Sequence, residues 1–170
     1  MAKAATAKST ARTYHTSAAV NEEHRQPLIA LMNLRLADST DIYSQIKWAH
    51  WNVKGKDFYQ LHLLFDSIAE HIEDHSDTIA ERITAIGGVA NGTIREAAAK
   101  SSINEADLSA SDGPSMIKFL VHNFGYYANA LRTAIDEADK LGDPLTVDLF
   151  TQLSREADKD LWFLEAHIQA

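Results

Sequence analysis

The sequence predicts an all-α protein: a four-helix bundle with one long crossover connection that carries a short helix, preceded by a mobile N-terminal tail. Three observations favour this fold. Apolar residues recur at helical spacing in four long segments. Proline or a capping residue opens most of these segments, and glycine follows most of them. The link between the second and third segments, about twenty-five residues, is far longer than the other links.

Residues 1–26 are expected to form a flexible basic tail, because they are rich in Ala, Lys, Ser and Thr and bury too little apolar surface to become ordered. The bundle is expected over residues 27–170. Its first helix begins at Pro27, which suits a first turn, and runs to about Val53 before Gly55. Its apolar positions are Leu28, Leu31, Met32, Leu34, Ile42 and Ile46.

The second helix is predicted over residues 58–86, with Asp57 as a candidate cap and two glycines at its end. Residues 94–100 can form a short helix in the crossover. The third helix is predicted over residues 114–141 and the fourth over residues 144–167. The long crossover allows the second and third helices to run parallel, which is the topology of ferritin-like bundles.

Composition excludes several classes of function. A chain of 170 residues with 45% apolar and 24% charged residues fits one globular domain. It contains no cysteine, which excludes thiol catalysis, disulfides and cysteine-ligated metals. No apolar run is long enough to span a membrane, and the basic N-terminus lacks the apolar region of a secretory signal. We therefore expect a cytoplasmic protein, with nucleoid association as an open alternative, and no membrane partner.

Charge is unevenly divided between the tail and the body. Residues 1–26 carry a net +2, whereas residues 27–170 carry −10. An acidic body attracts cations and is a poor partner for nucleic acid.

The second predicted helix carries a stripe of metal-ligand residue types. At 100° per residue, His62, Asp66, Asp77 and Glu81 fall within about 100° of one another. The apolar residues of this helix cluster on a different face, which must be the one buried in the bundle. They are Leu61, Phe65, Ile68, Ile72, Ile79, Ile83 and Ile86.

The length of this stripe predicts a site shared between two chains. His62 and Asp77 are about 22 Å apart along a helix, so they cannot hold one ion within a single chain. The four residues are mirror-placed about position 71.5. Two copies of the helix that cross antiparallel there would bring His62 and Asp66 of one chain to Asp77 and Glu81 of the other, in two equivalent sites. His50, near the end of the first helix, can complete each site.

Imidazole and carboxylate ligands suit iron(II), manganese or zinc, and the spacing alone does not choose among them. A solvated acidic helix face is the alternative interpretation of the stripe. The Glu-x-x-His motifs of di-iron centres within one chain are absent, because no histidine has a glutamate three residues before it. A site at a subunit interface is therefore favoured.

The sequence resembles the Dps family, the starved-cell DNA-protection proteins or mini-ferritins. The resemblance covers about residues 27–168 and is densest over 47–88, KWAHWNVKGKDFYQLHLLFDSIAEHIEDHSDTIAERITAIGG. The matching positions are His50-Trp51-Asn52, Gly55, His62, Asp66, His75, Asp77-Thr78, Ala80-Glu81-Arg82 and Gly87-Gly88, with residues 160–165 similar as well.

This resemblance implies a hollow dodecamer that oxidises iron(II), preferring hydrogen peroxide, and stores ferric mineral. It assigns His50, His62 and Asp66 to one subunit and Asp77 and Glu81 to its two-fold mate. Two further assignments have plain alternatives. Trp51 resembles a tryptophan that traps oxidising equivalents, and is otherwise an interface aromatic. Lys47 is expected either to pair with a site carboxylate or to be an ordinary surface lysine.

The acidic turn before the last helix is similar to the lining of pores that admit iron, with Asp143 and Asp148 as candidates. Surface capping is the plain alternative. In the tail, Lys3, Lys8 and Arg12 are candidates for non-specific DNA binding through phosphates, multiplied by twelve copies.

The main alternative function is therefore a DNA-coating structural protein with a weak or zinc-occupied oxidase centre. A scaffold recruited for hydrolysis is a further one, although no Ser/His/Asp arrangement supports it. A structural role is expected for His71 and His75. The roles of Glu70, Glu73 and the tail histidines His15 and His24 stay open.

Overall fold

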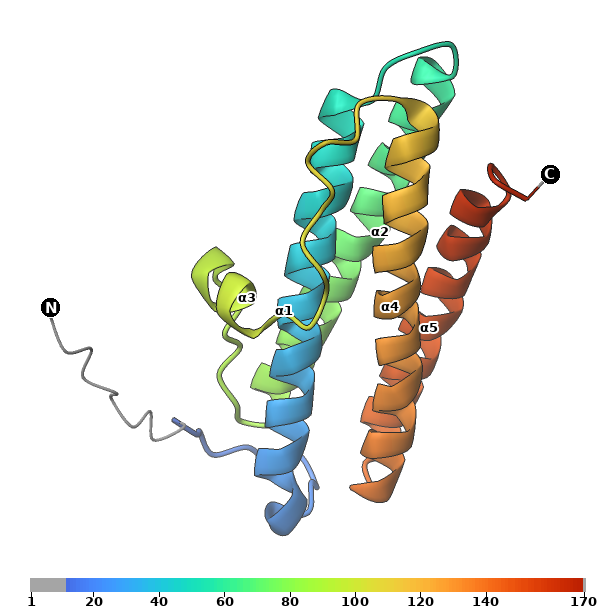
Figure 1. The fold of residues 1–170 in the computed structure, drawn as a ribbon. Helices are drawn as coiled ribbons and strands as arrows, with labels where there is room; N and C mark the ends of the chain where they lie inside the picture. Colours follow the sequence, from blue (N-terminus) through green and yellow to red (C-terminus); the bar gives the residue numbers. More distant parts are fainter. Residues whose placement is uncertain (1–11, 170) are drawn as a thin grey trace, which may run out of the picture.

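A computed structural model describes residues 12–169 and confirms the predicted four-helix bundle (Figure 1). Its helices are α1 (Glu22–Asn52), α2 (Phe58–Ala85), the short α3 (Ile94–Lys100), α4 (Gly113–Lys140) and α5 (Pro144–Glu165). The described range contains no strand, and none of its helices is both long and apolar enough to cross a bilayer.

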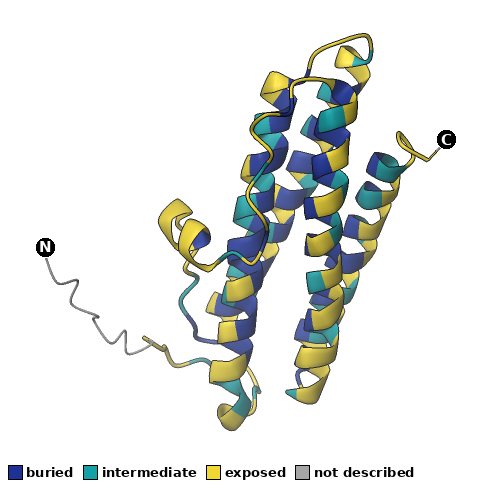
Figure 2. Ribbon diagram, in the orientation of Figure 1, coloured by how far each residue is buried: buried dark blue, intermediate teal, exposed yellow. Residues whose placement is uncertain are grey.

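The helices form two antiparallel pairs, α1 with α2 and α4 with α5 (Figure 1). The crossover from α2 carries α3 beside α1 and then climbs along α1 to the start of α4. As a result α2 and α4 run in the same direction, as predicted. The buried positions follow the inward faces of the four long helices (Figure 2).

The core contains the apolar face predicted for α2. All seven of its predicted members are buried: Leu61, Phe65, Ile68, Ile72, Ile79, Ile83 and Ile86. Each side chain of this size stabilises the fold by about 1.5–3 kcal/mol on burial. This face therefore fixes the rotation of α2 and leaves its polar stripes on other sides of the helix.

The helix starts differ in how they are capped. Asp112 caps α4 through a reciprocal capping box with Ser115. Asp57 and Asp143 stand at the cap positions of α2 and α5, but neither side chain bonds the backbone of the first turn. Asp57 instead accepts a hydrogen bond from Gln60.

α1 begins at Glu22, five residues before the predicted start at Pro27, because the Asn21 side chain accepts a hydrogen bond from the Glu23 backbone. The residues before it lie against the far end of α2. The Tyr14 N–H donates to the Gly87 carbonyl at 2.8 Å, and Thr16 Oγ1 donates to the Ala85 carbonyl at 3.0 Å. Part of the predicted tail therefore has fixed hydrogen bonds. The flexibility expected of residues 1–11 concerns a segment outside the described range.

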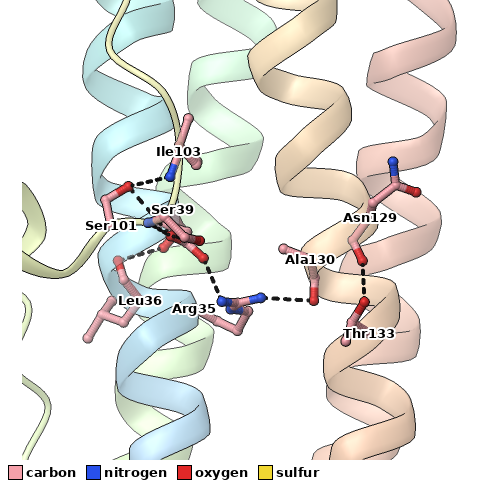
Figure 3. A network of polar contacts seen from close by, with 10 residues as sticks. Arg35, Leu36, Ser39, Ser101, Ile103, Asn129, Ala130 and Thr133 are labelled. Atoms are coloured by element: carbon pink, nitrogen blue, oxygen red, sulfur yellow. Dashed lines mark hydrogen bonds and ion pairs between the residues drawn. The ribbon is translucent and has the colours of Figure 1, made fainter.

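A buried ion pair on α1 holds the crossover in place (Figure 3). Arg35 lies 3.0 Å from Asp38 Oδ2 and donates to the Ala130 carbonyl of α4 at 3.1 Å. The other oxygen of Asp38 accepts from the backbone N–H and the hydroxyl of Ser102, at 2.7 and 2.9 Å. Asp38 is fully buried and connects α1 to the crossover, while its ion-pair partner Arg35 connects α1 to α4.

Candidate metal centre

The tight turn between α1 and α2 brings His50 and His62 face to face. Gly55 allows the turn because its φ is +109°, in the region that other residues seldom adopt. The two imidazole rings stack with centroids 3.8 Å apart and planes 20° apart. His50 is nearly buried, and His62 is partly exposed.

The two histidines are held by reciprocal hydrogen bonds. His50 Nδ1 lies 2.8 Å from the His62 carbonyl oxygen, and His62 Nδ1 lies 2.9 Å from the His50 carbonyl oxygen. A carbonyl oxygen only accepts, so each Nδ1 carries the proton and donates it. In the neutral ring, Nε2 is then the nitrogen with the free lone pair. Backbone support of this kind orients histidines for metal binding.

Asp66, one turn after His62, stands beside this pair. Its Oδ1 accepts a hydrogen bond from Lys47 Nζ at 2.6 Å and lies 3.7 Å from His50 Nδ1. The hydrogen bond from Lys47 holds the pKa of Asp66 below its ordinary value. Of the two interpretations of Lys47, the structure therefore supports pairing with a site carboxylate.

Asp77 and Glu81 are exposed on the other half of α2. Within residues 12–169, no group of three or more His, Asp or Glu side chains is placed to hold an ion. The structure thus brings His50, His62 and Asp66 together, and leaves Asp77 and Glu81 apart from them. A single chain must separate these residues in this way, because His62 and Asp77 lie too far apart along the helix to hold one ion.

Large apolar side chains that neighbour the histidine pair in the chain are exposed, and the Phe58 ring lies 5.2 Å from that of His62. Trp51, Phe58, Tyr59 and Leu63 are 66%, 43%, 70% and 49% exposed. Several such residues close together are typical of a surface that is covered in an assembly. The histidine pair therefore lies within an apolar surface, which we call the α1–α2 surface.

The other histidines of α2 have the structural contacts expected of them. His75 is buried and bonds Tyr127 on α4, while His71 pairs with the buried carboxylate of Asp160 on α5, 2.9 Å away. Burial raises the pKa of Asp160, although His71 opposes the shift. Glu70 and Glu73 are both exposed.

Asp143, a candidate for a pore lining, is largely buried and engaged. It forms an ion pair with Arg82 of α2 and accepts a hydrogen bond from the Thr146 hydroxyl. Burial favours a higher pKa for Asp143, but these hydrogen bonds outweigh it and leave the pKa lowered. Its charge is therefore already balanced, whereas the second candidate, Asp148, is exposed.

The tail candidates are only partly described. Lys3 and Lys8 lie outside the described residues, and Arg12 is exposed near the Tyr14 hydroxyl. His15 is exposed, whereas His24 bonds the Leu141 carbonyl at the end of α4, at 2.7 Å.

Sequence reasoning missed the reciprocal backbone support of His50 and His62. The tight turn and the positions of the histidines in the two helices pointed to their proximity. Nothing in the residue pattern specified which ring nitrogen meets which carbonyl, because that depends on how closely the two helices approach.

Comparison with known proteins places the fold and the site residues in context. The ferritin-like domain family matches residues 29–170. A DNA protection during starvation protein of Agrobacterium fabrum is 36% identical over 158 residues, which are 93% of this chain and 98% of that protein. DpsA14 from Streptomyces coelicolor is 30% identical with a TM-score of 0.88, over 94% of this chain and 95% of that one.

A Dps protein from Vibrio cholerae O1 is described as a member of a broad superfamily of ferritin-like diiron-carboxylate proteins. It is 27% identical with a TM-score of 0.81, over 91% of this chain and 100% of that one.

Proposed function

Because the chain belongs to the Dps family of ferritin-like proteins, we propose that it oxidises iron(II), with hydrogen peroxide as the preferred oxidant, and stores the ferric product inside a dodecameric cage. Removing iron(II) and peroxide together would protect DNA from oxidative damage. The observation that carries this proposal is the histidine pair, fixed by backbone carbonyls beside Asp66 and lying within an exposed apolar surface.

The metal site is completed by a second copy of the chain. A two-fold axis near residues 71 and 72 sets His62 of one α2 opposite Glu81 of the other, and Asp66 opposite Asp77. His50 belongs to the same half as His62. The exposed apolar residues of the α1–α2 surface support this pairing, since a mate would cover them.

The ligand set suits iron chemistry. Neutral imidazoles bind iron(II), and carboxylates stabilise the additional charge of iron(III). Zinc and manganese accept the same donors and are expected to compete with iron. Lys47 supplies a positive charge to Asp66 until a metal ion takes its place. Two iron(II) ions each give one electron to one peroxide molecule, which is then reduced to water with little release of hydroxyl radical.

Two further roles follow from position. Trp51 is 66% exposed next to His50, where it would both pack against the mate and intercept oxidising equivalents. In the proposed cage, Asp148 is an exposed carboxylate near the start of α5 and would line an iron pathway. Asp143 would contribute less, because Arg82 neutralises it.

The decisive test of the oxidase is an anaerobic titration with iron(II), followed by addition of peroxide. We expect rapid growth of ferric absorbance, largely lost in the double variant His50→Ala/His62→Ala. His122→Ala is the matched control, because His122 is exposed and distant from the pair in the chain. Equal rates in the wild type and the double variant would refute the site.

We propose separately that Lys3, Lys8 and Arg12 bind DNA through its phosphates, without sequence preference. All three basic residues precede Tyr14 and Thr16, which are hydrogen-bonded to the end of α2. Twelve such segments would bind DNA together and so overcome its repulsion by the acidic body.

Gel shifts at low and high salt, with and without residues 1–12, test this proposal. Binding that survives high salt or the deletion would contradict it. The alternative of a DNA-coating protein with a zinc-occupied centre predicts DNA binding without iron oxidation.

A further inference from the structure

A chain of three polar side chains runs through the bundle on the core side of α2. Tyr127 of α4 is fully buried, and its hydroxyl oxygen lies 3.0 Å from Nδ1 of His75 on α2. Nε2 of His75 lies 3.1 Å from Oε2 of Glu156 on α5. His75 is fully buried, whereas the Glu156 side chain is 45% exposed. These three residues, which we call the Tyr127 triad, link the core to the surface.

The outer end of the triad sets the direction of its hydrogen bonds. The Glu156 carboxylate accepts hydrogen bonds, one of them from Gln152 Nε2 at 3.2 Å on its other oxygen. The proton between Glu156 and His75 therefore belongs to Nε2. Nδ1 then has a free lone pair, and the Tyr127 hydroxyl donates to it.

This arrangement supplies what a tyrosine needs in order to lose an electron. A one-electron-oxidised phenol is a strong acid, so its oxidation is easy only when a base takes the proton at once. His75 is such a base at hydrogen-bonding distance, and Glu156 stabilises the imidazolium that forms, as the carboxylate does in acid–base triads. Burial raises the pKa of Tyr127, so the phenol stays protonated until it is oxidised.

The position of the triad is also suited to this role. His75 lies two residues before the metal-ligand candidate Asp77, but His75 is buried and Asp77 is exposed, so their side chains leave α2 on different faces. The triad thus stands behind one half of the proposed metal site. Full burial of Tyr127 keeps a radical there from coupling with another protein.

We propose that Tyr127 is a redox-active tyrosine that quenches strongly oxidising radicals by giving up its electron and passing its phenolic proton to His75. The oxidant in the cell is the hydroxyl radical left when peroxide takes a single electron from iron(II), and this source rests on the proposed function. The radical takes the electron and a solvent proton and becomes water. The O–H bond of Tyr127 breaks, and its proton moves to His75 Nδ1.

The cycle closes when a second iron(II) returns an electron to the neutral tyrosyl radical and becomes iron(III). The proton then moves back from His75 to the phenolic oxygen. His75 is the proton acceptor in this scheme, and Glu156 is a positioning residue because it acts through His75. In net terms, the hydroxyl radical oxidises one iron(II), and the other side chains of the protein stay unoxidised.

The test uses the assembled full-length protein without iron. One-electron oxidation by azide radical from pulse radiolysis is followed by rapid freezing and electron paramagnetic resonance. We expect a tyrosyl signal that resists brief exposure to ascorbate because Tyr127 is buried. Tyr127→Phe should abolish this resistant signal, whereas Tyr126→Phe should keep it, since Tyr126 is its exposed neighbour on α4. Glu156→Gln, which keeps an acceptor for Nε2 but removes the charge, should lower the yield.

The proposal is overturned if the wild type gives no resistant signal, if Tyr127→Phe retains it, or if Glu156→Gln leaves the yield unchanged. Circular dichroism and thermal unfolding of each variant confirm that the bundle is intact. Because no iron is present, these outcomes are independent of whether the metal site oxidises iron, which the ferric absorbance measurement decides separately.

Discussion

At His50 and His62 the main chain orients both side chains in the way that the proposed metal site requires. Each ring donates from Nδ1 to the carbonyl of the other residue, so the loss of one histidine removes a ligand and also the ring stacked against its partner. Effects of the two substitutions should therefore be non-additive. Lys47 is a second residue that orients the proposed site, because it pairs with the carboxylate of Asp66 when no metal is bound.

Lys47→Met should tighten iron(II) binding. The ammonium group competes with the metal for Asp66, but the pair is partly exposed and screened, so we expect a gain in affinity of about fivefold or less. The pKa of Asp66 should rise toward its ordinary value, since the hydrogen bond from Lys47 is the largest cause of its lowering. Anaerobic calorimetry and carboxyl NMR measure the two effects. Lys54→Met, outside the pair, should change neither, and weaker binding in Lys47→Met would contradict this role.

His75 makes the stability of the bundle depend on pH. Its pKa is lowered in the folded protein by burial, so below its ordinary value of 6.5 the unfolded chain takes up a proton that the folded chain resists. The free energy of unfolding should therefore fall as the pH drops from 6.5 toward the lower folded pKa.

Buried Asp160 acts with the opposite sign over its own range. Its raised pKa gives a contribution that is present below 3.8 and lost as the pH rises through the folded value. Urea unfolding at fixed protein concentration measures the combined slope. His75→Gln should flatten the slope near pH 6.5, whereas the exposed His122→Gln should not. An unchanged slope in His75→Gln would show that His75 does not cause it.

At the scale of elements, α2 presents three faces with different tasks. Its apolar face fills the core, its metal stripe faces outward, and His71 and His75 bridge to α5 and α4. Periodicity predicted the core face, because burial of many apolar residues overrides other preferences. It did not predict the partners of the histidines, since these depend on contacts between distant parts of the chain. The early start of α1 at Glu22 was also missed, although the Asn21 cap that causes it is a local contact.

The same limit applies to the ends of elements. Asp143 has the residue type and position of a helix cap, yet Arg82 and Thr146 take its carboxylate. Arg82 is sixty-one residues away in the chain, so no local pattern reveals the pairing. The shared stripe of His62, Asp66, Asp77 and Glu81 was easier to predict, because helical geometry alone relates residues on one helix, and its role as a metal site stays a prediction.

Gly87→Ala should release the segment before α1 from the end of α2. Gly87 has φ +83°, and an added Cβ would lie 2.3 Å from the Tyr14 carbonyl oxygen. The left-handed conformation alone costs a non-glycine residue about 1–3 kcal/mol. Hydrogen exchange at the Tyr14 amide, which is bonded to Gly87, should become markedly faster. Gly125→Ala is the matched control, since its nearest contact at 3.8 Å is ordinary; equal exchange in both variants would disprove the docking.

For the whole molecule, a metal site divided between chains, as proposed, would link catalysis to assembly. One chain would carry both halves at opposite ends of α2, so each two-fold dimer would hold two sites, whereas residues 12–169 of a single chain bring no such group together. The apolar α1–α2 surface would then be exposed only in unassembled chains, where it favours pairing. Oxidation of iron would begin only when a mate is present.

Complementation between two inactive variants tests this division directly. His50→Ala/His62→Ala destroys one half of the site, and Asp77→Asn/Glu81→Gln destroys the other. A mixed dimer joins the intact half of one variant to the intact half of the other in one of its two sites. When equal amounts are unfolded and reassembled together, half of the dimers are mixed, so about one quarter of the wild-type rate should return. Each variant reassembled alone should stay inactive. If the mixture is as inactive as its components, both halves of the site belong to one chain, and the pairing about residues 71 and 72 is wrong.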